Sequence, residues 1–254
     1  MGALIEEPQL VRTTRRRSIR LADDSPVECA ACDQTRSGWF CSLGDAIQTE
    51  RDLIAATTYL PAQTTLFTQG EEARCVYVVC NGYLKLSVGR PGERQTVVRV
   101  ASPGTMLGLY AVLNHGVHEV SAESLTVSQI KPIERSLFLQ FLATHQEAAV
   151  RATRCLGFEY RFALQSTCRI AGPESVAARL GRLVVDLGQQ IGMRDVDGKV
   201  SFPQLLTHEE MASMAVTTRE TVTRTLGQFR KKGWISIRKA MIKIENSYAL
   251  ESLL

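Results

Sequence analysis

Residues 206–229 read LTHEEMASMAVTTRETVTRTLGQF, and this stretch decides the fold of the C-terminal part of the chain. It predicts two short helices joined by a tight turn. Each helix begins with a T-x-x-E capping box, at residues 207–210 and 217–220. In that motif the threonine oxygen and the glutamate satisfy backbone N–H groups that have no partner within the helix. Two capped helices in direct succession are typical of a helix-turn-helix.

Both predicted helices have an apolar face. In the second helix the apolar positions 222, 226 and 229 recur at i, i+4 and i+7. Its opposite face carries charged and hydroxyl side chains, which are the types that read base edges in a major groove. A helix-turn-helix places its second helix there, with the N-terminal end toward the bases. We therefore expect sequence-specific binding of double-stranded DNA through Thr218, Arg219, Glu220, Thr223 and Arg224.

The residues after the second helix support this interpretation. The run RKKG at 230–233 ends the helix with cations at its negative end and glycine just beyond. Alternating runs at 234–237 and 241–244 predict a β-hairpin wing whose tip, residues 238–240, is basic. Such a wing suits the phosphate backbone, with Lys231 and Lys239 as its expected contacts. The alternative is a small amphipathic α+β subdomain with a solvated basic face.

Length, charge and cysteine content bound the class of protein. With 254 residues, 44% hydrophobic and 22% charged, the chain has room for two globular domains. The net charge is only +4, so a nucleic-acid footprint must be local; basic residues gather at 219–243 and 12–20. No apolar run approaches the roughly 18 residues that span a membrane, and no signal peptide is visible. The odd number of cysteines, seven, indicates a reducing cytoplasm.

The middle of the chain changes from strands to helices. Residues 59–131 read as short strands separated by glycine-containing turns, which predicts a sandwich or jelly roll. A long helix follows, and Gly172-Pro173 interrupts it. Apolar and small residues in this helix have a 4-3 spacing that forms either a dimer seam or a face packed on its own domain. We favour a homodimer, with the seam at Ala149, Thr153, Leu156, Tyr160, Ala163, Thr167 and Ile170.

These patterns predict an α+β chain in four segments. We expect a flexible arm with a cysteine-bearing loop at 1–48 and a β-roll sensor domain at 49–143. The dimerisation helix follows at 144–172, and a winged helix-turn-helix domain at 173–254 completes the chain.

This order of elements resembles the Crp/Fnr family of bacterial transcription regulators, from about Thr49 to Asn246. The stretch RETVTRTLGQFRKKGWISI at 219–237 is similar to the family's recognition helix and wing. The resemblance implies that Arg219, Glu220, Thr223 and Arg224 occupy base-reading positions and that RNA polymerase is a further partner. Val216 departs from the family, where the turn between the helices commonly has glycine. Because a β-branched residue disfavours positive φ, we expect a different turn here.

The sensor also departs from the family's nucleotide-binding members. Those members carry a glutamate just after a Pro-Gly turn, and an Arg-Ser pair about ten residues later, for the ribose hydroxyl and the cyclic phosphate. Leu109 stands near the glutamate position here, and His118-Glu119-Val120 replaces the Arg-Ser pair. Glu119 would repel a phosphate. We therefore expect a nucleotide-binding fold that does not bind cyclic AMP, and the effector stays unassigned.

Three cysteines near the N-terminus resemble the cluster ligands of Fnr-type members. Cys29, Cys32 and Cys41 have the spacing C-x2-C-x8-C. Thiolates suit zinc or an iron–sulfur cluster, so the possible cofactors are zinc and a [4Fe–4S] centre. The position of the family's fourth cysteine is Ser128 here, which leaves Cys75 or Cys80 as substitutes. The alternative is a reduced loop without a ligand.

We compare two alternative functions with that of a DNA-binding regulator. A jelly roll can be a cupin-like metal-dependent enzyme, here with an accessory basic domain, but that requires several converging histidines. The chain has four, and His208 lies in the helix-turn-helix while His115 and His118 are expected on a loop. A nucleotide-sensing domain of a channel or kinase would need a membrane span or kinase motifs. No catalytic residues are assigned, and the chain is not expected to be an enzyme.

Overall fold

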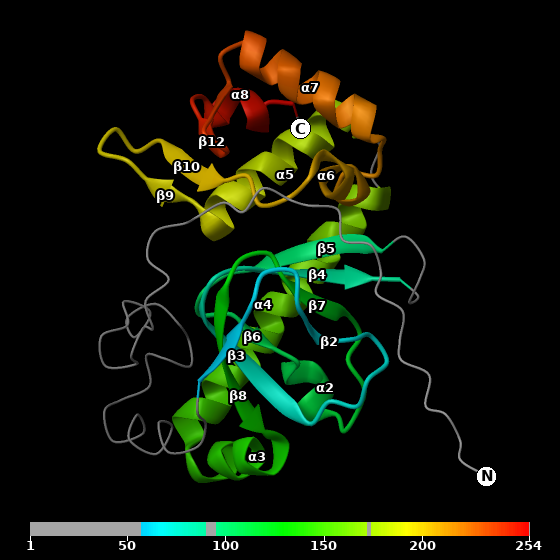
Figure 1. Cartoon of the computed structure of the whole chain (residues 1–254), viewed down its shortest axis with the longest axis vertical. Helices are drawn as coiled ribbons and strands as arrows, with labels where there is room; N and C mark the ends of the chain where they lie inside the picture. Colours follow the sequence, from blue (N-terminus) through cyan, green and yellow to red (C-terminus); the bar gives the residue numbers. More distant parts are fainter. Residues whose placement is uncertain (1–56, 90–94, 172–173, 254) are drawn as a thin grey trace, which may run out of the picture.

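The computed structural model of the chain describes residues 57–89, 95–171 and 174–253. Figure 1 shows a β-roll below and a smaller helix-rich unit above, with the long helix α4 running between them. Cys29, Cys32, Cys41 and the basic stretch 12–20 lie outside the described residues. No helix within the described residues is both long and apolar enough to cross a membrane.

The β-roll consists of two four-stranded sheets in which all strand pairs are antiparallel. One sheet has the order β1-β8-β3-β6 and the other has the order β2-β7-β4-β5. Alternate residues of the strands face a shared core, in which Phe67, Leu84 and Ile130 are almost completely buried. The strands are β1 (Thr58–Leu60), β2 (Thr65–Phe67), β3 (Cys75–Asn81), β4 (Leu84–Val88), β5 (Thr96–Ala101), β6 (Met106–Leu107), β7 (Ser121–Ser124) and β8 (Ser128–Glu134).

Three helices close the β-roll on one side. They are α2 (Leu109–Leu113), α3 (Arg135–Thr144) and α4 (Gln146–Ala171). Glu134 caps α3, because its side chain accepts hydrogen bonds from the first backbone N–H groups of the helix. Small residues of α4, Ala148 and Ala152, let the helix approach Phe138, Phe141 and the helix α2. One side of α4 is therefore committed to packing on its own β-roll.

The C-terminal unit contains the predicted helix-turn-helix and wing. Its sheet has the order β11-β12-β10-β9. The wing hairpin of β11 and β12 is therefore extended by two further strands, β10 and β9, that the sequence analysis did not predict. The unit's apolar core gathers Leu180, Val184, Phe202, Leu226 and Phe229. Its elements are α5 (Val176–Ile191), β9 (Met193–Arg194), β10 (Val200–Pro203), α6 (His208–Met214), α7 (Arg219–Lys231), β11 (Ile235–Arg238), β12 (Met241–Ile244) and α8 (Ser247–Glu251).

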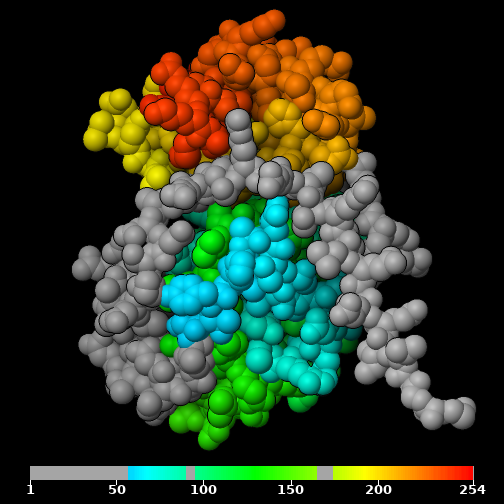
Figure 2. Space-filling model, in the orientation of Figure 1, coloured from blue at the N-terminus to red at the C-terminus, as the bar shows by residue number. Residues whose placement is uncertain are grey.

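The β-roll and the C-terminal unit touch through β4, β5 and α6. Figure 2 shows the orange and red atoms of the upper unit as a separate lobe above the cyan and green β-roll. Val97 and Val100 of β5 are buried in the same apolar cluster as Met211 of α6. The helix-turn-helix is thus packed directly on the β-roll, with α6 next to β5 and α7 above it (Figure 1).

Candidate nucleic-acid interface

The first helix of the pair begins as its sequence predicts. The Glu210 N–H donates to Thr207 Oγ1 at 3.2 Å, and the Thr207 N–H donates to Glu210 Oε2 at 2.8 Å. This reciprocal arrangement is a complete capping box. Met211 and Ala215 are buried, so the first helix also has an apolar face toward the core.

The second helix begins one residue later than its sequence predicts. Its N-cap is Thr218, whose side chain accepts from the Thr221 N–H at 3.3 Å, so no box forms between Thr217 and Glu220. Two adjacent threonines made the register ambiguous. Glu220 instead lies in the first turn, where its own backbone N–H and the Thr218 hydroxyl hold its pKa below the ordinary value. The helix start therefore carries a stabilised negative charge beside Arg219.

The turn between the helices contradicts one expectation. Val216 has a φ of 50°, the left-handed conformation that its branched side chain disfavours, so the turn adopts a positive φ without glycine. Arg179 of α5 holds this turn. Its guanidinium donates to the carbonyl oxygens of Ala215 at 2.9 Å and Val216 at 3.2 Å, and to that of Glu174 at 2.6 Å. No pattern in the sequence predicts this role of Arg179.

The structure brings the predicted DNA-reading residues together on one face of α7. Val222, Leu226 and Phe229 are buried on the inner face, 2% exposed or less. The outer face is open to solvent along its whole length and includes one residue not expected from the sequence, Gln228. The exposed predicted residues are Thr218, Arg219, Glu220, Thr223 and Arg224.

Thr223 differs from the other residues of this face because its hydroxyl contacts a side chain of the neighbouring helix α6. The hydroxyl donates to the Arg219 carbonyl oxygen at 3.0 Å and lies 2.8 Å from His208 Nδ1. His208 belongs to α6, so this contact joins the two helices. Burial, with the nearby charge of Arg219, lowers the pKa of His208, which favours its neutral form. Thr223 therefore helps to fix α7 against α6.

The wing presents a basic tip. Lys239 and Ala240 connect β11 to β12 with φ values of 48° and 59°, the sign pattern of a two-residue type I′ hairpin turn. Lys239 is exposed at this tip, and Lys231 is exposed at the end of α7. Arg238 was expected in the tip but is the last residue of β11, paired with Met241. The exposed cations Lys231 and Lys239 thus lie at two separate points, the end of α7 and the tip of the wing.

Three residues of the predicted seam, Thr153, Tyr160 and Ala163, lie exposed on α4. Tyr160 is 68% exposed and Leu164 is 47% exposed, and both are large side chains on a helix. Leu156 is only half-buried and packs partly against the β-roll core. The backbone of Thr167 lies in α4, while its side chain is outside the described residues.

The sensor positions contain apolar and negative groups. Leu109 is 1% exposed, and Glu119 is exposed to solvent. His118 was expected on a loop surface, but it is 3% exposed and stacks on Phe67 with ring centroids 3.8 Å apart. Burial lowers the pKa of His118, so the ring is held neutral in the core. The imidazole of His118 is therefore part of the core, where it is covered by Phe67, a residue 51 positions earlier in the chain.

A cleft of about 980 Å³ lies between β5, α4 and α5. Arg99 projects along it, over the rings of Phe158 at 5.8 Å and Phe162 at 5.1 Å, and its Nη1 atom is 3.9 Å from a Glu159 carboxylate oxygen. The Arg99 Nε atom is buried and has no hydrogen-bond partner. Burial raises the pKa of Glu159, although Arg99 opposes that rise. Sequence reasoning did not identify this cleft.

The described residues offer little for a metal centre. No group of three His, Cys, Asp or Glu side chains within the described ranges is arranged to hold a metal ion. Ser128 is buried, and its hydroxyl donates to the Thr126 carbonyl oxygen at 2.9 Å. Burial raises the pKa of the Cys75 thiol, which opposes the thiolate form that binds metals. The three N-terminal cysteines lie outside the described residues.

Comparison with known proteins assigns both parts of the chain. Residues 57–145 match the cyclic nucleotide-binding domain family, and residues 176–253 match the Crp-like helix-turn-helix domain family. A CRP-like cAMP-activated global transcriptional regulator of Mycobacterium tuberculosis is 24% identical over 190 residues, 75% of this chain and 84% of that protein. The fumarate and nitrate reduction regulatory protein of Salmonella typhimurium is 24% identical over 190 residues, 74% of each chain.

Solved structures agree on the fold. FixK2 from Bradyrhizobium japonicum superimposes with a TM-score of 0.69 at 18% identity, over 79% of this chain and 97% of that one. A CRP-family transcriptional regulator from Thermus thermophilus gives a TM-score of 0.63 at 24% identity, over 77% and 95%. These relatives are regulators, and the alternative of a cupin-like enzyme finds no support among them.

Proposed function

The chain belongs to the Crp/Fnr family of DNA-binding transcription regulators, and from that premise we propose that it reads an inverted-repeat DNA site as a homodimer through α7. One observation carries this proposal. The helix α7 buries one face in its domain and leaves the other, with Arg219, Glu220 and Arg224, open to solvent. An exposed polar face on the second helix of such a pair is what a major groove accepts.

The exposed residues have different roles in this proposal. Arg219 and Arg224 donate to guanine edges, and Glu220 accepts from cytosine. Thr218 at the helix start lies where a phosphate meets free backbone N–H groups. Thr223 is bonded to His208 and orients the helix more than it reads bases. Lys231 and Lys239 neutralise phosphates on either side of the groove.

Dimerisation through α4 provides the two-fold symmetry that an inverted repeat requires. The face with Thr153, Tyr160 and Ala163 is exposed along the helix, while the opposite side packs on the β-roll. A second copy of α4 would cover this face. RNA polymerase is the further partner by which a regulator of this kind acts, and the cytoplasm is its expected location.

Competition binding tests the proposal directly. A duplex selected from a random library should bind the wild-type dimer, and Arg219→Ala should weaken that duplex by about 1–3 kcal/mol while relaxing preference at one base pair. Arg74→Ala is the matched control, because Arg74 lies on the β-roll with 81% of its side chain exposed. If Arg219→Ala and Arg74→Ala have the same site preference as wild type, α7 does not read the bases.

For the sensor, we propose a signal other than cyclic AMP. Leu109 is apolar and buried, so it offers no acceptor for a ribose hydroxyl, and Glu119 brings a negative charge toward a phosphate. Titration calorimetry with cyclic AMP should therefore show no binding at micromolar concentration. We further propose that Cys29, Cys32 and Cys41 form a redox- or metal-responsive site, because three thiols at this spacing suit a [4Fe–4S] cluster or zinc.

A further inference from the structure

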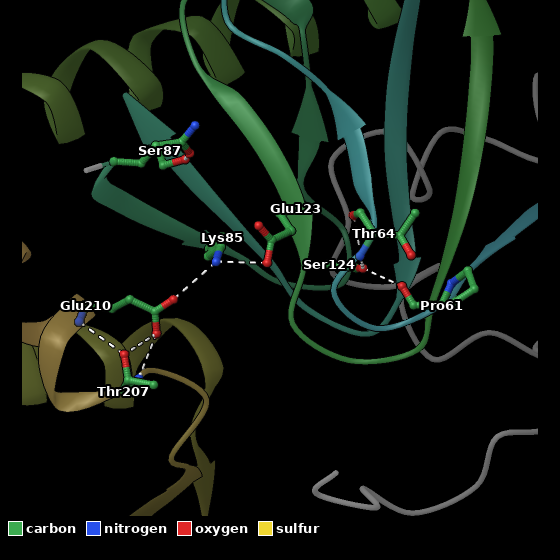
Figure 3. Close-up of polar contacts among 9 residues, drawn as sticks. Pro61, Thr64, Lys85, Ser87, Glu123, Ser124, Thr207 and Glu210 are labelled. Carbon is green, nitrogen blue, oxygen red and sulfur yellow. Dashed lines mark hydrogen bonds and ion pairs between the residues drawn. The ribbon is translucent and has the colours of Figure 1, made fainter. Parts of the chain in front are cut away.

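One ion pair joins the sensor to the helix-turn-helix. Lys85 of β4 places its Nζ atom 3.2 Å from Glu210 Oε1 on α6 and 2.9 Å from Glu123 Oε1 on β7. Figure 3 shows the ammonium group between the two carboxylates. The side chains of Lys85 and Glu210 are only 15% and 12% exposed. Salt and water therefore screen this contact much less than a surface pair.

The carboxylate of Glu210 also accepts hydrogen bonds at the start of α6. Its other oxygen, Oε2, accepts from the Thr207 N–H at 2.8 Å and from the Thr207 hydroxyl at 2.7 Å, which closes the capping box of α6 (Figure 3). The Glu210 side chain thus caps the start of α6, the first helix of the DNA-reading pair, and also binds Lys85 of the β-roll. A cation on the sensor is coupled to the start of α6 through a single carboxylate.

Contacts around the pair fix α6 against the sheet. The Val97 N–H of β5 donates to Ser213 Oγ of α6 at 3.3 Å. Val97 and Val100 are buried in one cluster with Met211. The outer face of α7 stays exposed while α6 is docked, so this contact leaves Arg219 and Arg224 free for DNA.

We propose that Lys85 is a positioning residue for DNA recognition: by holding Glu210 it sets how the helix pair α6–α7 lies on the β-roll. The inference rests on the proposed function, since it concerns how strongly α7 reads its site. Removing the ammonium leaves Glu123 and Glu210 without the cation between them, and the two carboxylates then repel each other. The helix pair loses its fixed orientation, and the two copies of α7 fit paired half-sites less well.

The test measures DNA affinity by fluorescence anisotropy with the full-length dimer and a selected duplex. Lys85→Met removes the charge and keeps most of the aliphatic chain. Glu210→Gln removes the partner charge and keeps an oxygen that accepts from the Thr207 N–H. We expect about fivefold or greater loss of affinity for each variant. The double variant should bind no more weakly than the weaker single variant, because both changes break one contact.

Two further variants separate positioning from general stability. Lys85→Arg should recover most of the affinity, since it restores a cation near Glu210. Glu123→Gln removes only the neighbour within the β-roll and should bind DNA like wild type. Thermal unfolding of every variant is recorded in parallel.

The proposal fails if Lys85→Met lowers the melting temperature but binds DNA like wild type, or if it binds more tightly. It also fails if the losses from Lys85→Met and Glu210→Gln add in the double variant. A wild-type protein that selects no duplex would instead overturn the proposed function itself.

Discussion

The guanidinium of Arg179 donates to the carbonyl oxygen of Val216 at 3.2 Å and so grips the turn of the helix-turn-helix from a helix outside it. Val216 has a φ of 50°, in the left-handed region. Such a conformation costs roughly 1–2 kcal/mol for a residue with a Cβ atom. Arg179 also bonds the Ala215 carbonyl oxygen, so two acceptors of the turn depend on one side chain of α5.

Val216→Gly should stabilise the protein. Glycine adopts positive φ without steric cost, and the Val216 side chain is 50% exposed, so little apolar burial is lost. The greater freedom of glycine in the unfolded chain offsets part of the gain, which leaves up to about 1 kcal/mol. Urea denaturation should show a higher midpoint with an unchanged slope. A lower midpoint would mean that the branched side chain contributes packing that outweighs its strain.

The turn illustrates what a sequence reveals and what it hides. The periodicity of positions 222, 226 and 229 predicts the buried face of α7, because helical spacing alone decides it. The partners of Arg179 and Lys85 lie on other elements, and only the tertiary fold brings them together. No local sequence pattern predicts contacts of this kind.

Individual strands are hard to predict where they are short or made of small polar residues. The strand β7 reads SAES, and its Ala122 and Ser124 are fully buried between neighbouring strands. Neither alanine nor serine favours strands, so this strand is recognised only from its pairing with β2 and β4 in the structure. The cap of α7 was misplaced by one residue because Thr217 and Thr218 are chemically equivalent in the sequence.

Lys239→Asn should weaken binding to every duplex by a similar factor. Lys239 has a φ of 48°, which asparagine tolerates, so the turn is kept while the charge is lost. One fewer phosphate contact should lower the slope of log affinity against log salt by about 1. Anisotropy titrations across a salt series give this slope for specific and random duplexes. A change confined to one sequence would assign Lys239 to base reading instead of phosphate contact.

Tyr160→Glu should convert the protein to a monomer. Tyr160 is 68% exposed on the side of α4 that the β-roll does not cover, and a buried pair of like charges at a two-fold axis is unfavourable. Tyr248→Glu is the matched control, because Tyr248 is 79% exposed on α8. Sedimentation at micromolar concentration should show dimers for wild type and the control, and monomers for Tyr160→Glu. A wild-type monomer, with or without DNA, would remove α4 as the dimer helix.

His118 should make the fold sensitive to mild acid. Burial holds its pKa below 6.5, while Glu71 opposes this shift. The unfolded chain then binds the proton more readily, so the free energy of unfolding falls as pH drops below 6.5. His118→Phe keeps a ring against Phe67 and should flatten this dependence by up to about 1.4 kcal/mol per pH unit. Urea unfolding at neutral and mildly acidic pH measures how the free energy of unfolding depends on pH.

The control for this pH effect is His115→Asn. His115 is exposed and has a φ of 51°, which asparagine adopts readily, so the variant removes a histidine without disturbing the core. Its pH dependence should match that of wild type. If His118→Phe loses stability with acid as steeply as wild type does, another group controls the response.

Cys32→Ser should abolish any response of DNA binding to oxygen. A centre held by Cys29, Cys32 and Cys41 would order the N-terminal segment, because metal-binding free energy becomes folding free energy. Anaerobically purified wild type should contain iron or zinc, and iron–sulfur loading should give a broad visible absorption band that Cys32→Ser lacks. Cys155→Ser is the control: burial beside Glu159 raises the pKa of Cys155 to about 12, so it is not expected to ligate. Wild type without either metal, with equal DNA affinity in air and under nitrogen, would exclude the cysteines as the sensor.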